Sequence, residues 1–504
     1  MSTVGVKPKV GSRRISSTRP RYHPSSAKSP NRGPGFKLNF VDFVPKCIEP
    51  EGLFTSPKYE RFDMATVGVK VKVGSRRISS TRVRYRPPKE KQSNKGPGYK
   101  LNFVDFVPKC VEPEGLFNSP KYERFDILVE RANQWLSEHT NVQVKTCETI
   151  EVKSKQTCHH VDSNKSTYYE QPGRQRTQFV RALRLWVGPH FGPPETHRIR
   201  YFNAMPYMTD DDVLEKPIFE SFRQTIERVN DILRKNPLHG KIVTVETQEM
   251  KYKEFSNGLD PDKSYSAEGN KCVEYFLVCI RIFYVSGAPT YEEIGCADFV
   301  PQYLESGYET FQSVLNRASL WLRQQHSIRL TNIQSMNYKA KSGEPLDTQR
   351  SFYSFNAGNG WGKGTKYLRI LRVCYTKPSA LEVVINRPHP VITYKTFFPA
   401  QITKSGPFSP PKFETQQECM HRIQTWLSLT DVDVISAETL AVRMLSGGQY
   451  GNDEQMFTWD TGTDETWLFV LRVYLSGYYI EPSPSDLPAL PVPKHEQEEC
   501  CTIV

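Results

Sequence analysis

A helical pattern that occurs four times is the feature that most restricts how this chain can fold. The segments YERFDILVERANQWL (122–136), FESFRQTIERVNDIL (219–233), YETFQSVLNRASLWL (308–322) and FETQQECMHRIQTWL (413–427) align without a gap. Each contains an aromatic residue followed by Glu, an Arg eight residues after that Glu, and a terminal Leu. Apolar residues recur in the first segment with a 3.6-residue period, which predicts an amphipathic helix. The chain therefore contains four copies of one supersecondary unit.

Each predicted helix is flanked by β-forming sequence in the same order. A short strand that stops at a proline precedes it, as in NFVDFVP, RYFNAMP, GCADFVP and YKTFFPA. Two strands follow it, such as VQVKTCETIEV and VRALRLWV in the first unit, with a long variable loop between them. Ser119 and Pro120, which recur as Ser409 and Pro410, are the predicted N-cap and first-turn proline.

These patterns predict an α+β protein of four tandem two-layer β-α-β-β units. In each unit one helix should cover a three-stranded sheet, and neighbouring units should pack in pairs because a single unit is small. The predicted units are 103–188, 198–286, 294–377 and 390–477, preceded by basic disordered arms at 1–39 and 64–102 and a truncated copy at 40–63, and followed by a proline-rich tail at 478–504.

The truncated copy arises because the chain begins twice. MSTVGVKPKVGSRRISSTR at Met1 is nearly repeated as MATVGVKVKVGSRRISSTR from Met64, and the two copies run in register over 1–63 and 64–126. The first copy ends before the apolar stripe of its helix is complete, so it cannot form a unit. A copy that restarts at Met indicates a duplicated first exon or an error in the gene model.

Positive charge is concentrated in the two arms. Residues 1–39 hold nine Lys or Arg and no acid, and residues 64–102 hold eleven against one Glu. Because the whole chain carries only +12, the rest of it is net acidic. We therefore expect any affinity for a polyanion to reside in the arms, which are also rich in Pro and Ser and are predicted to be disordered. The predicted polyanion-binding residues are Arg13, Arg14, Arg76, Arg77, Arg82 and Arg84.

The sequence RRIS, which occurs in both arms, has the form of a basophilic kinase site at Ser16 and Ser79. A phosphate there would remove about two units of positive charge from the arm.

Composition argues against secretion and against a bound metal. The N-terminus does not resemble a signal peptide, and no apolar stretch approaches the roughly 18 residues needed to span a bilayer, so we expect a cytoplasmic protein. The eleven cysteines are odd in number and lack CxxC pairs, which indicates reduced thiols. Cys158, His159 and His160, with Cys147 upstream, suggest a metal site but lack a second ligand pair. We therefore predict no metal and no other cofactor.

The C-terminus suggests two kinds of partner. Cys501-Thr502-Ile503-Val504 has the C-a-a-X form and resembles the end of prenylated proteins, with Cys500 beside it as a palmitoyl acceptor. The same residues are similar to ligands of PDZ domains. A silent tail is the third alternative. The preceding EPSPSDLPALPVPK is predicted to be a spacer that holds the end away from the body.

Charged residues recur at three positions of every unit. A Glu at the start of a helix interacts favourably with the helix dipole. An Arg flanked by apolar residues on the last strand is expected to face outward and pair across the sheet. We interpret these residues as structural ion pairs, with acid-base chemistry or anion binding as the alternative. They are Glu123, Arg131 and Arg184; Glu220, Arg228 and Arg281; Glu309, Arg317 and Arg372; and Glu414, Arg422 and Arg472.

No catalytic residues are predicted, because no nucleophile and base recur together and the Gly-rich segment 358–366 lacks the spacing of a phosphate loop. We therefore expect a non-enzymatic intracellular repeat protein that acts as an interaction scaffold for proteins, with a C-terminal lipid placing it on the inner face of an anionic membrane. One alternative is a nucleic-acid-binding protein that uses the arms. The other is an enzyme with its site between units.

Overall fold

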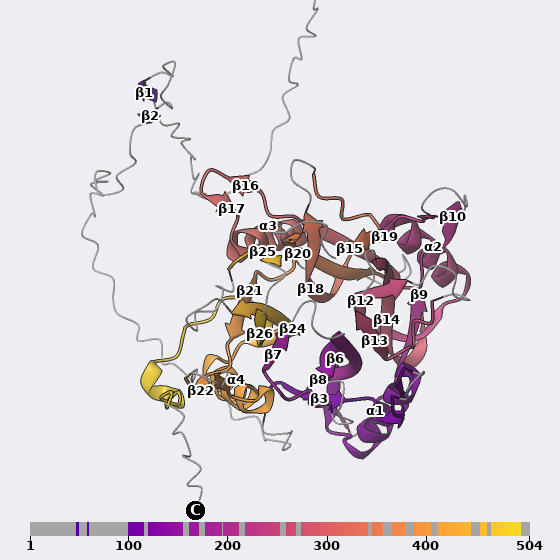
Figure 1. Cartoon of the computed structure of the whole chain (residues 1–504), viewed down its shortest axis with the longest axis horizontal. Coiled ribbons are helices and arrows are strands. Elements are labelled where there is room, and N and C mark those ends of the chain that lie inside the picture. Colours follow the sequence, from indigo (N-terminus) through magenta and orange to yellow (C-terminus); the bar gives the residue numbers. More distant parts are fainter. Residues whose placement is uncertain are drawn as a thin grey trace, which may run out of the picture. The chain divides into compact units, whose positions relative to one another are not determined.

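The computed structural model shows a mostly β protein with four helices in its described part (Figure 1). Residues 90–504 form one compact body, and residues 1–89 form a separate part. Within the described residues, no helix is long and apolar enough to cross a bilayer. The structure describes residues 47–49, 58–59, 99–114, 119–154, 161–170, 177–193, 195–210, 217–252, 259–268, 274–340, 345–355, 365–378, 388–404, 411–444, 454–460 and 465–494.

Four units follow one another in the body, and each has the same order of elements. A strand is followed by a small hairpin, a helix, a long strand, a short strand and another long strand. Unit 1 contains β3 (Asn102–Phe106), β4 (Cys110–Glu112), β5 (Lys121–Tyr122), α1 (Phe125–Glu138), β6 (Val142–Ser154), β7 (Thr167–Glu170) and β8 (Thr177–Pro189). Unit 2 contains β9 (Ile199–Ala204), β10 (Met208–Asp210), β11 (Ile218–Phe219), α2 (Phe222–Lys235), β12 (Leu238–Tyr252), β13 (Tyr265–Glu268) and β14 (Glu274–Thr290).

The same series continues through the second half of the body. Unit 3 contains β15 (Glu293–Phe299), β16 (Tyr303–Leu304), β17 (Gly307–Tyr308), α3 (Phe311–Arg323), β18 (Arg329–Ala340), β19 (Phe352–Phe355) and β20 (Thr365–Lys377). Unit 4 contains β21 (Ile392–Phe397), β22 (Gln401–Thr403), β23 (Lys412–Phe413), α4 (Gln416–Thr430), β24 (Asp433–Met444), β25 (Phe457–Asp460) and β26 (Glu465–Ser476). A short 3-10 helix, η2 (Pro484–Asp486), follows.

The truncated N-terminal copy contains the hairpin of a unit. Strands β1 (Cys47–Glu49) and β2 (Lys58–Tyr59) pair with Cys47 opposite Tyr59, as Cys110 lies opposite Tyr122 in unit 1. The hairpin sequences of the two copies are nearly identical, which explains why the same strand register forms in both.

The last long strand of each unit is the centre of its sheet. In unit 1, β6 pairs along one edge of β8, and β3 pairs with residues 183–187 on the other edge, both antiparallel. The first part of that edge, residues 177–180, pairs with β13 of unit 2. An unpaired edge of backbone donors and acceptors requires such a partner. The sheets therefore have four strands rather than the expected three.

Strand exchange of this kind joins the units into a closed ring. Strand β19 of unit 3 pairs with β14 of unit 2, and β25 of unit 4 pairs with β20 of unit 3. Strand β7 of unit 1 completes the series by pairing with β26 of unit 4. The four sheets therefore lie around a common centre (Figure 1). The expectation that units pack in pairs is wrong, because every unit receives a short strand from one neighbour and donates its own short strand to the other.

Each helix packs between its own sheet and the next one. The apolar stripe of α1 shares a core with Ile199 and Phe283 of unit 2. In the same way α3 packs with Tyr474 of unit 4, and α4 packs with Phe103 and Trp186 of unit 1. A helix thus stabilises the junction between units as well as its own unit.

The helices begin later than the sequence predicted. Ser119 and Pro120 precede the hairpin strand β5, and Arg124 is the N-cap of α1. The backbone N–H of Phe125 donates to the carbonyl oxygen of Asp262 in unit 2, at 2.9 Å, so a turn of the next unit satisfies the helix N-terminus. Equivalent bonds join Phe222 to Gln349, Phe311 to Glu454 and Gln416 to Asn164.

The C-terminal segment lies against unit 4 up to Lys494. Glu481 accepts hydrogen bonds from Trp426 Nε1 at 3.1 Å and from Lys395 Nζ at 2.8 Å, and Tyr479 and Leu487 pack against the core beneath α4. The expected spacer that holds the tail away from the body is therefore wrong over this range. Tyr479 and Leu487 gain more by packing on unit 4 than by remaining exposed.

Candidate functional site

Charged and hydroxyl side chains converge where the four units meet. Strands β6, β12, β18 and β24 each pack against their two neighbours around the centre of the body. Each carries a Glu or Gln followed by Thr or Ser, and this pair lies in register with the recurring Arg of the last strand. We call these residues the polar ring: Glu148, Thr149, Arg184, Glu246, Thr247, Arg281, Gln334, Ser335, Arg372, Glu438, Thr439 and Arg472.

The carboxylates of the polar ring link each unit to the one before it. Glu246 of unit 2 accepts hydrogen bonds from the backbone N–H and Oγ1 of Thr149 in unit 1, at 2.7 and 2.8 Å. Glu438 binds Ser335 in the same way, and Glu148 binds Thr439, which closes the ring between units 1 and 4. These bonds occupy both oxygens of each carboxylate.

Unit 3 has an amide at this position. Gln334 accepts from the backbone N–H of Thr247 at 3.0 Å and donates from Nε2 to the carbonyl oxygen of Thr247, also at 3.0 Å. An amide has one acceptor and one donor end, so it bonds to the backbone twice rather than to the hydroxyl. The link between units is kept without a charge.

The four last-strand arginines are fully buried, which corrects the expectation that they face outward. Each side chain is 0% exposed. The Arg281 guanidinium donates from Nη1 to Thr149 Oγ1 at 2.9 Å and lies 3.8 Å from the ring centroid of Phe125, both in unit 1. The hydroxyl and the aromatic face replace water around the charge. Arg372 over Phe222 and Arg472 over Phe311 repeat this arrangement, and Gln416 takes the place of the Phe beside Arg184.

The first strand of each unit supplies a further partner for the arginine. Arg372 donates to both carboxylate oxygens of Asp298, at 2.6 and 2.7 Å, and Arg184 donates to both oxygens of Asp105 at 2.7 Å. In units 2 and 4 this partner is neutral: Asn203 for Arg281, at 2.8 Å, and Thr396 for Arg472, at 3.0 Å.

The two kinds of partner compensate for each other, so that each of the four last-strand arginines has a carboxylate either in register with it or bonded to it. Unit 3 lacks the ring carboxylate because Gln334 is neutral, and there Asp298 carries the charge. Burial lowers the pKa of Arg281, whose first-strand partner is neutral. Burial also opposes the charge of Arg372, but the hydrogen bonds that Arg372 donates to Asp298, together with the surrounding acidic groups, raise its pKa. A buried charge without such a partner would cost several kcal/mol.

Glu148 is the one polar-ring carboxylate in a unit that also has a first-strand Asp. Because Asp105 already binds Arg184 with both oxygens, Glu148 is less well compensated. Burial raises the pKa of Glu148 to about 7, against the opposing effect of Arg184. The ring thus contains a carboxyl group that changes charge near neutral pH.

Glu148→Gln is expected to flatten the pH dependence of stability. The folded pKa of about 7 lies above the ordinary value of 4.5, so between these values the folded state binds the proton more tightly than the unfolded state. This contribution to the free energy of unfolding is present below pH 4.5, falls by at most about 1.4 kcal/mol per pH unit as pH rises, and is lost above pH 7. Urea denaturation of both proteins from pH 5 to pH 8 measures it. Parallel curves for wild type and variant would contradict the assignment.

The helix-start glutamates fasten the small hairpins to the helices. Glu309 forms an ion pair with Arg317 at 2.7 Å and accepts from the backbone N–H of Gln302 at 2.9 Å. Arg317 also donates to the carbonyl oxygen of Val300 at 2.7 Å. The equivalent ion pairs are Glu123 with Arg131, Glu220 with Arg228, and Glu414 with Arg422. Each Glu lies two residues before its helix, so its contacts are to the hairpin and the Arg.

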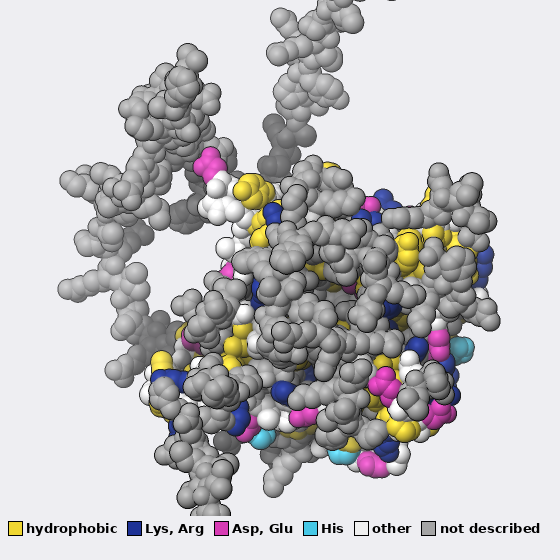
Figure 2. All heavy atoms as spheres, viewed as in Figure 1, with side chains coloured by type: hydrophobic (Ala, Val, Ile, Leu, Met, Phe, Trp, Pro, Cys, Tyr) yellow, Lys and Arg dark blue, Asp and Glu magenta, His cyan; other side chains and the backbone are white. Residues whose placement is uncertain are grey.

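The hairpins expose large apolar side chains at the edge of the ring. Val111 is 63% exposed, Met208 45%, Tyr303 74% and Ile402 36%. Figure 1 places β10, β16, β17 and β22 at the periphery, and Figure 2 shows hydrophobic side chains near β10 and near β16. Every unit therefore presents at least one apolar residue on its hairpin.

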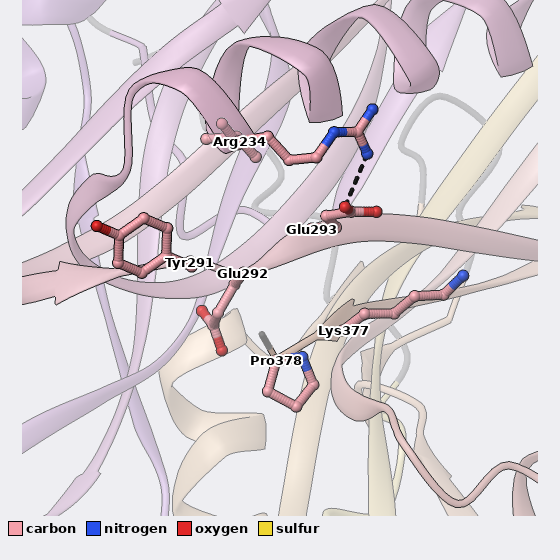
Figure 3. A pocket seen from close by; sticks show the side chains of 7 residues that line it. Arg234, Tyr291, Glu292, Glu293, Lys377 and Pro378 are labelled. Atoms are coloured by element: carbon pink, nitrogen blue, oxygen red, sulfur yellow. Dashed lines mark hydrogen bonds and ion pairs between the residues drawn. The ribbon is translucent and has the colours of Figure 1, made fainter. Parts of the chain in front are cut away.

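Two cavities lie at junctions. One of about 350 Å³, between units 2 and 3, is lined by Arg234, Tyr291, Glu292, Glu293 and Lys377, among others (Figure 3). Its Arg234 and Glu293 form an ion pair at 2.7 Å, and Glu292 pairs with Arg329. These carboxylates are therefore engaged in structural contacts. The other cavity, of about 480 Å³, lies between unit 4 and the C-terminal segment.

Several residues predicted from sequence lie outside the described part of the chain. They are Arg13, Arg14, Ser16, Arg76, Arg77, Ser79, Arg82, Arg84, Cys158, His159, His160, Cys500 and Cys501, together with most of the Gly-rich segment 358–366. Cys147, the upstream member of the suggested metal cluster, is buried, and burial raises the pKa of its thiol well above the ordinary value. A protonated thiol is a poor metal ligand.

Sequence reasoning missed the first-strand aspartates and the helix-start phenylalanines. NFVDFVP and GCADFVP place Asp105 and Asp298 at the same aligned position. An acidic residue that recurs on this short strand is a sequence signal for a partner of the last-strand arginine. Phe125 begins α1 as part of its apolar stripe and Phe222 begins α2, and each also contacts an arginine of the next unit.

Comparison of the chain with protein-family models, with curated proteins and with solved structures finds no match.

Proposed function

We propose that this protein is a non-enzymatic scaffold that binds extended segments of other proteins along the exposed hairpins of its ring. The polar ring favours this over catalysis, because its carboxylates and arginines bond to Thr and Ser across unit junctions, and Arg372 also binds Asp298 of its own unit. Carboxylates and guanidinium groups that already form these hydrogen bonds are poorly placed to bind a substrate. The hairpins, in contrast, combine free apolar side chains with backbone edges.

The tail segment docked on unit 4 is the observation that carries this proposal. Lys494 donates its backbone N–H to the carbonyl oxygen of Ile402 at 3.0 Å and accepts from the backbone N–H of Lys404 at 2.9 Å. It thereby forms a parallel bridge beside β22, at Thr403. Addition of an extended peptide to a strand edge is a common mode of peptide recognition. The chain's own proline-rich tail occupies one hairpin in this mode.

The hairpin of unit 2 is a counterpart that the tail does not occupy. Alignment of FFPAQITK with FVPKCVEP places Pro113 of unit 1 at the position of Lys404, and a proline has no N–H to donate. Unit 2 has no proline there and exposes Met208 and Ile218, with Tyr207 held under the Arg228 guanidinium at 3.7 Å. We therefore propose β10 and β11 as the principal docking edge for a protein partner.

Met208→Asp combined with Ile218→Asp is expected to remove most partners that crosslink to the body in cells, because the charges would be desolvated when an apolar peptide docks. Crosslinking mass spectrometry of the full chain measures this loss. The matched control is Leu320→Asp with Leu429→Asp, since these residues are similarly exposed but lie on helices. Both variants should melt at the wild-type temperature. Equal loss in both, or in neither, would contradict the docking edge.

Two further parts of the proposal depend on sequence alone. A lipid on Cys501, with Cys500 as a second acceptor, would hold the scaffold at a membrane, and a PDZ domain is the alternative partner of the same tail. The basic arms would then contribute attraction to the anionic surface. Nucleic-acid binding through the arms is the alternative for those residues. The coloured side chains of the body in Figure 2 include Lys, Arg, Asp and Glu.

A further inference from the structure

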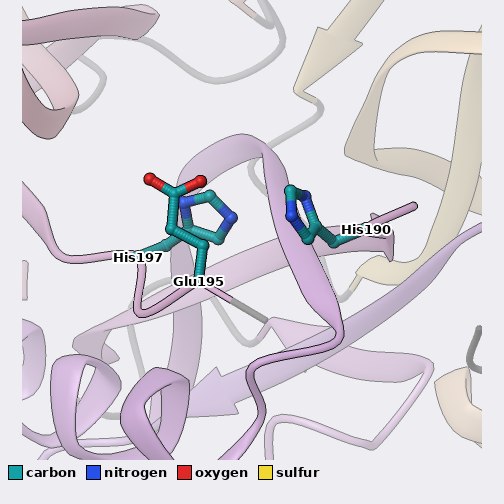
Figure 4. A group of neighbouring side chains, drawn as sticks. All are labelled: His190, Glu195 and His197. Atoms are coloured by element: carbon teal, nitrogen blue, oxygen red, sulfur yellow. The ribbon is translucent and has the colours of Figure 1, made fainter. Parts of the chain in front are cut away.

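The connector between β8 and β9 brings together three side chains that can ligate a metal. His190, Glu195 and His197 each offer a ligand atom, and these atoms lie within 4.8 Å of one another. Figure 4 shows the Glu195 carboxylate beside the His197 ring, with the His190 ring facing them across the connector. Two imidazoles and a carboxylate are a common ligand set of zinc sites that leave one position open.

His197 has an unused polar atom at this place. Its Nε2 is buried and has no hydrogen-bond partner among the described residues. A buried ring nitrogen without a partner is uncommon, because burial without a hydrogen bond is costly.

His190 is oriented by the connector itself. Its Nε2 lies 3.0 Å from the carbonyl oxygen of Pro193. Because a carbonyl oxygen only accepts, Nε2 carries the hydrogen and Nδ1 keeps the lone pair. Metal-binding histidines usually donate their second ring nitrogen in this manner, which fixes the tautomer and the ring position.

Both ends of the connector are anchored to the body. The backbone N–H of His190 donates to the carbonyl oxygen of Asn141 at 2.9 Å. At the other end, Ile199 exchanges two hydrogen bonds with the Asn133 side chain of α1, at 2.9 and 2.7 Å. The fold therefore holds the backbone at both ends of the connector, next to His190 and His197, before any ion binds.

We propose that His190, Glu195 and His197 bind one Zn²⁺, with the fourth position open to water, and that the ion fixes the connection between units 1 and 2. Zinc bonds of about 2.1 Å in a tetrahedral site require ligand atoms about 3.4 Å apart. The ligand atoms, which lie within 4.8 Å of one another, must therefore approach by at most about 1.4 Å, and the exposed Glu195 side chain is free of the packing that would resist this movement. The site goes beyond the proposed scaffold function and does not depend on it.

Zinc titration of the full chain, after removal of metal with a chelator, tests the site. Elemental analysis after gel filtration should give one Zn²⁺ per chain that His197→Ala loses, and Glu195→Gln should weaken the affinity at least tenfold. A His139→Ala control, and a variant that replaces Cys158, His159 and His160 together, should both keep this ion.

Folding is checked by thermal melts without zinc, in which the exposed Glu195→Gln variant should match wild type. Added zinc should raise the melting temperature of wild type but not that of His197→Ala. No bound zinc in wild type, or equal binding in wild type and both site variants, would overturn the proposal. Loss of the ion only when Cys158, His159 and His160 are replaced would overturn it as well.

Discussion

Arg372→Met is expected to lower the free energy of unfolding by about 3–5 kcal/mol, as when one partner of a buried ion pair is removed. The Arg372 side chain is 0% exposed and binds both oxygens of Asp298, at 2.6 and 2.7 Å. Gln334, the polar-ring residue in register with Arg372, is neutral and cannot replace the positive charge that the variant removes. The variant would therefore leave Asp298, whose side chain is only 10% exposed, as a carboxylate without a cation. Urea denaturation of the full chain measures the loss.

A second substitution separates charge from packing in this result. Asp298→Asn in the Arg372→Met background removes the unpaired carboxylate and should restore a substantial part of the lost stability. Unit 2 provides the precedent, because Asn203 occupies the equivalent position beside Arg281. If the double variant is as unstable as Arg372→Met alone, the loss comes from packing over Phe222, and the charge account of the polar ring is incorrect.

Removal of unit 4, by ending the chain after residue 388, is expected to abolish cooperative thermal unfolding of the three units that remain. Unit 3 would lose the strand β25 and the contact of α3 with Tyr474. Unit 1 would lose β26, the strand with which β7 pairs, and the unit 4 core residues that cover Trp186. Because the lost contacts lie on both sides of the gap, two of the three remaining units would expose core residues. Circular dichroism and calorimetry of the shortened chain measure the effect.

The matched control for this deletion is removal of residues 1–63, which belong to the separate N-terminal part. That variant should keep the wild-type melting temperature. In an open array of repeats, stability is a sum of units and nearest-neighbour interfaces, so three units would still melt cooperatively. A clear cooperative transition for the three-unit chain would therefore favour an open array over a ring.

The repetition and the element types of the fold can be read from the sequence, whereas the connections between units cannot. The helical period and the β-rich segments indicate four similar units, because both signals are local. The exchanged strands are only four residues long, such as TYYE in unit 1, and lie inside loops of variable sequence. Their partners belong to another unit, and nothing local sets that register. The sheets were therefore predicted with too few strands.

The polar ring also combines a feature that the sequence predicts with one that depends on contacts between units. The recurrence of Arg184 and its counterparts indicated a structural role, and apolar neighbours along the strand suggested exposure on the opposite face. That face is covered by the helix start and the strand hydroxyl of the preceding unit, such as Phe125 and Thr149 around Arg281. Burial of the arginine is therefore a property of the assembled ring. Sequence patterns within one unit carry no information about it.

Closure of the ring between units 1 and 4 is the central claim, and an engineered disulfide tests it most directly. Tyr168 of β7 lies opposite Trp467 of β26 in an antiparallel pair, where facing Cα atoms are about 4.5–5.5 Å apart and within disulfide reach. Tyr168→Cys with Trp467→Cys should give a disulfide within one chain, detected by non-reducing peptide mass spectrometry of the monomer fraction. Tyr168→Cys with Tyr303→Cys, on the hairpin of unit 3, should not. Absence of the first disulfide, or its formation only between chains, would contradict a closed ring.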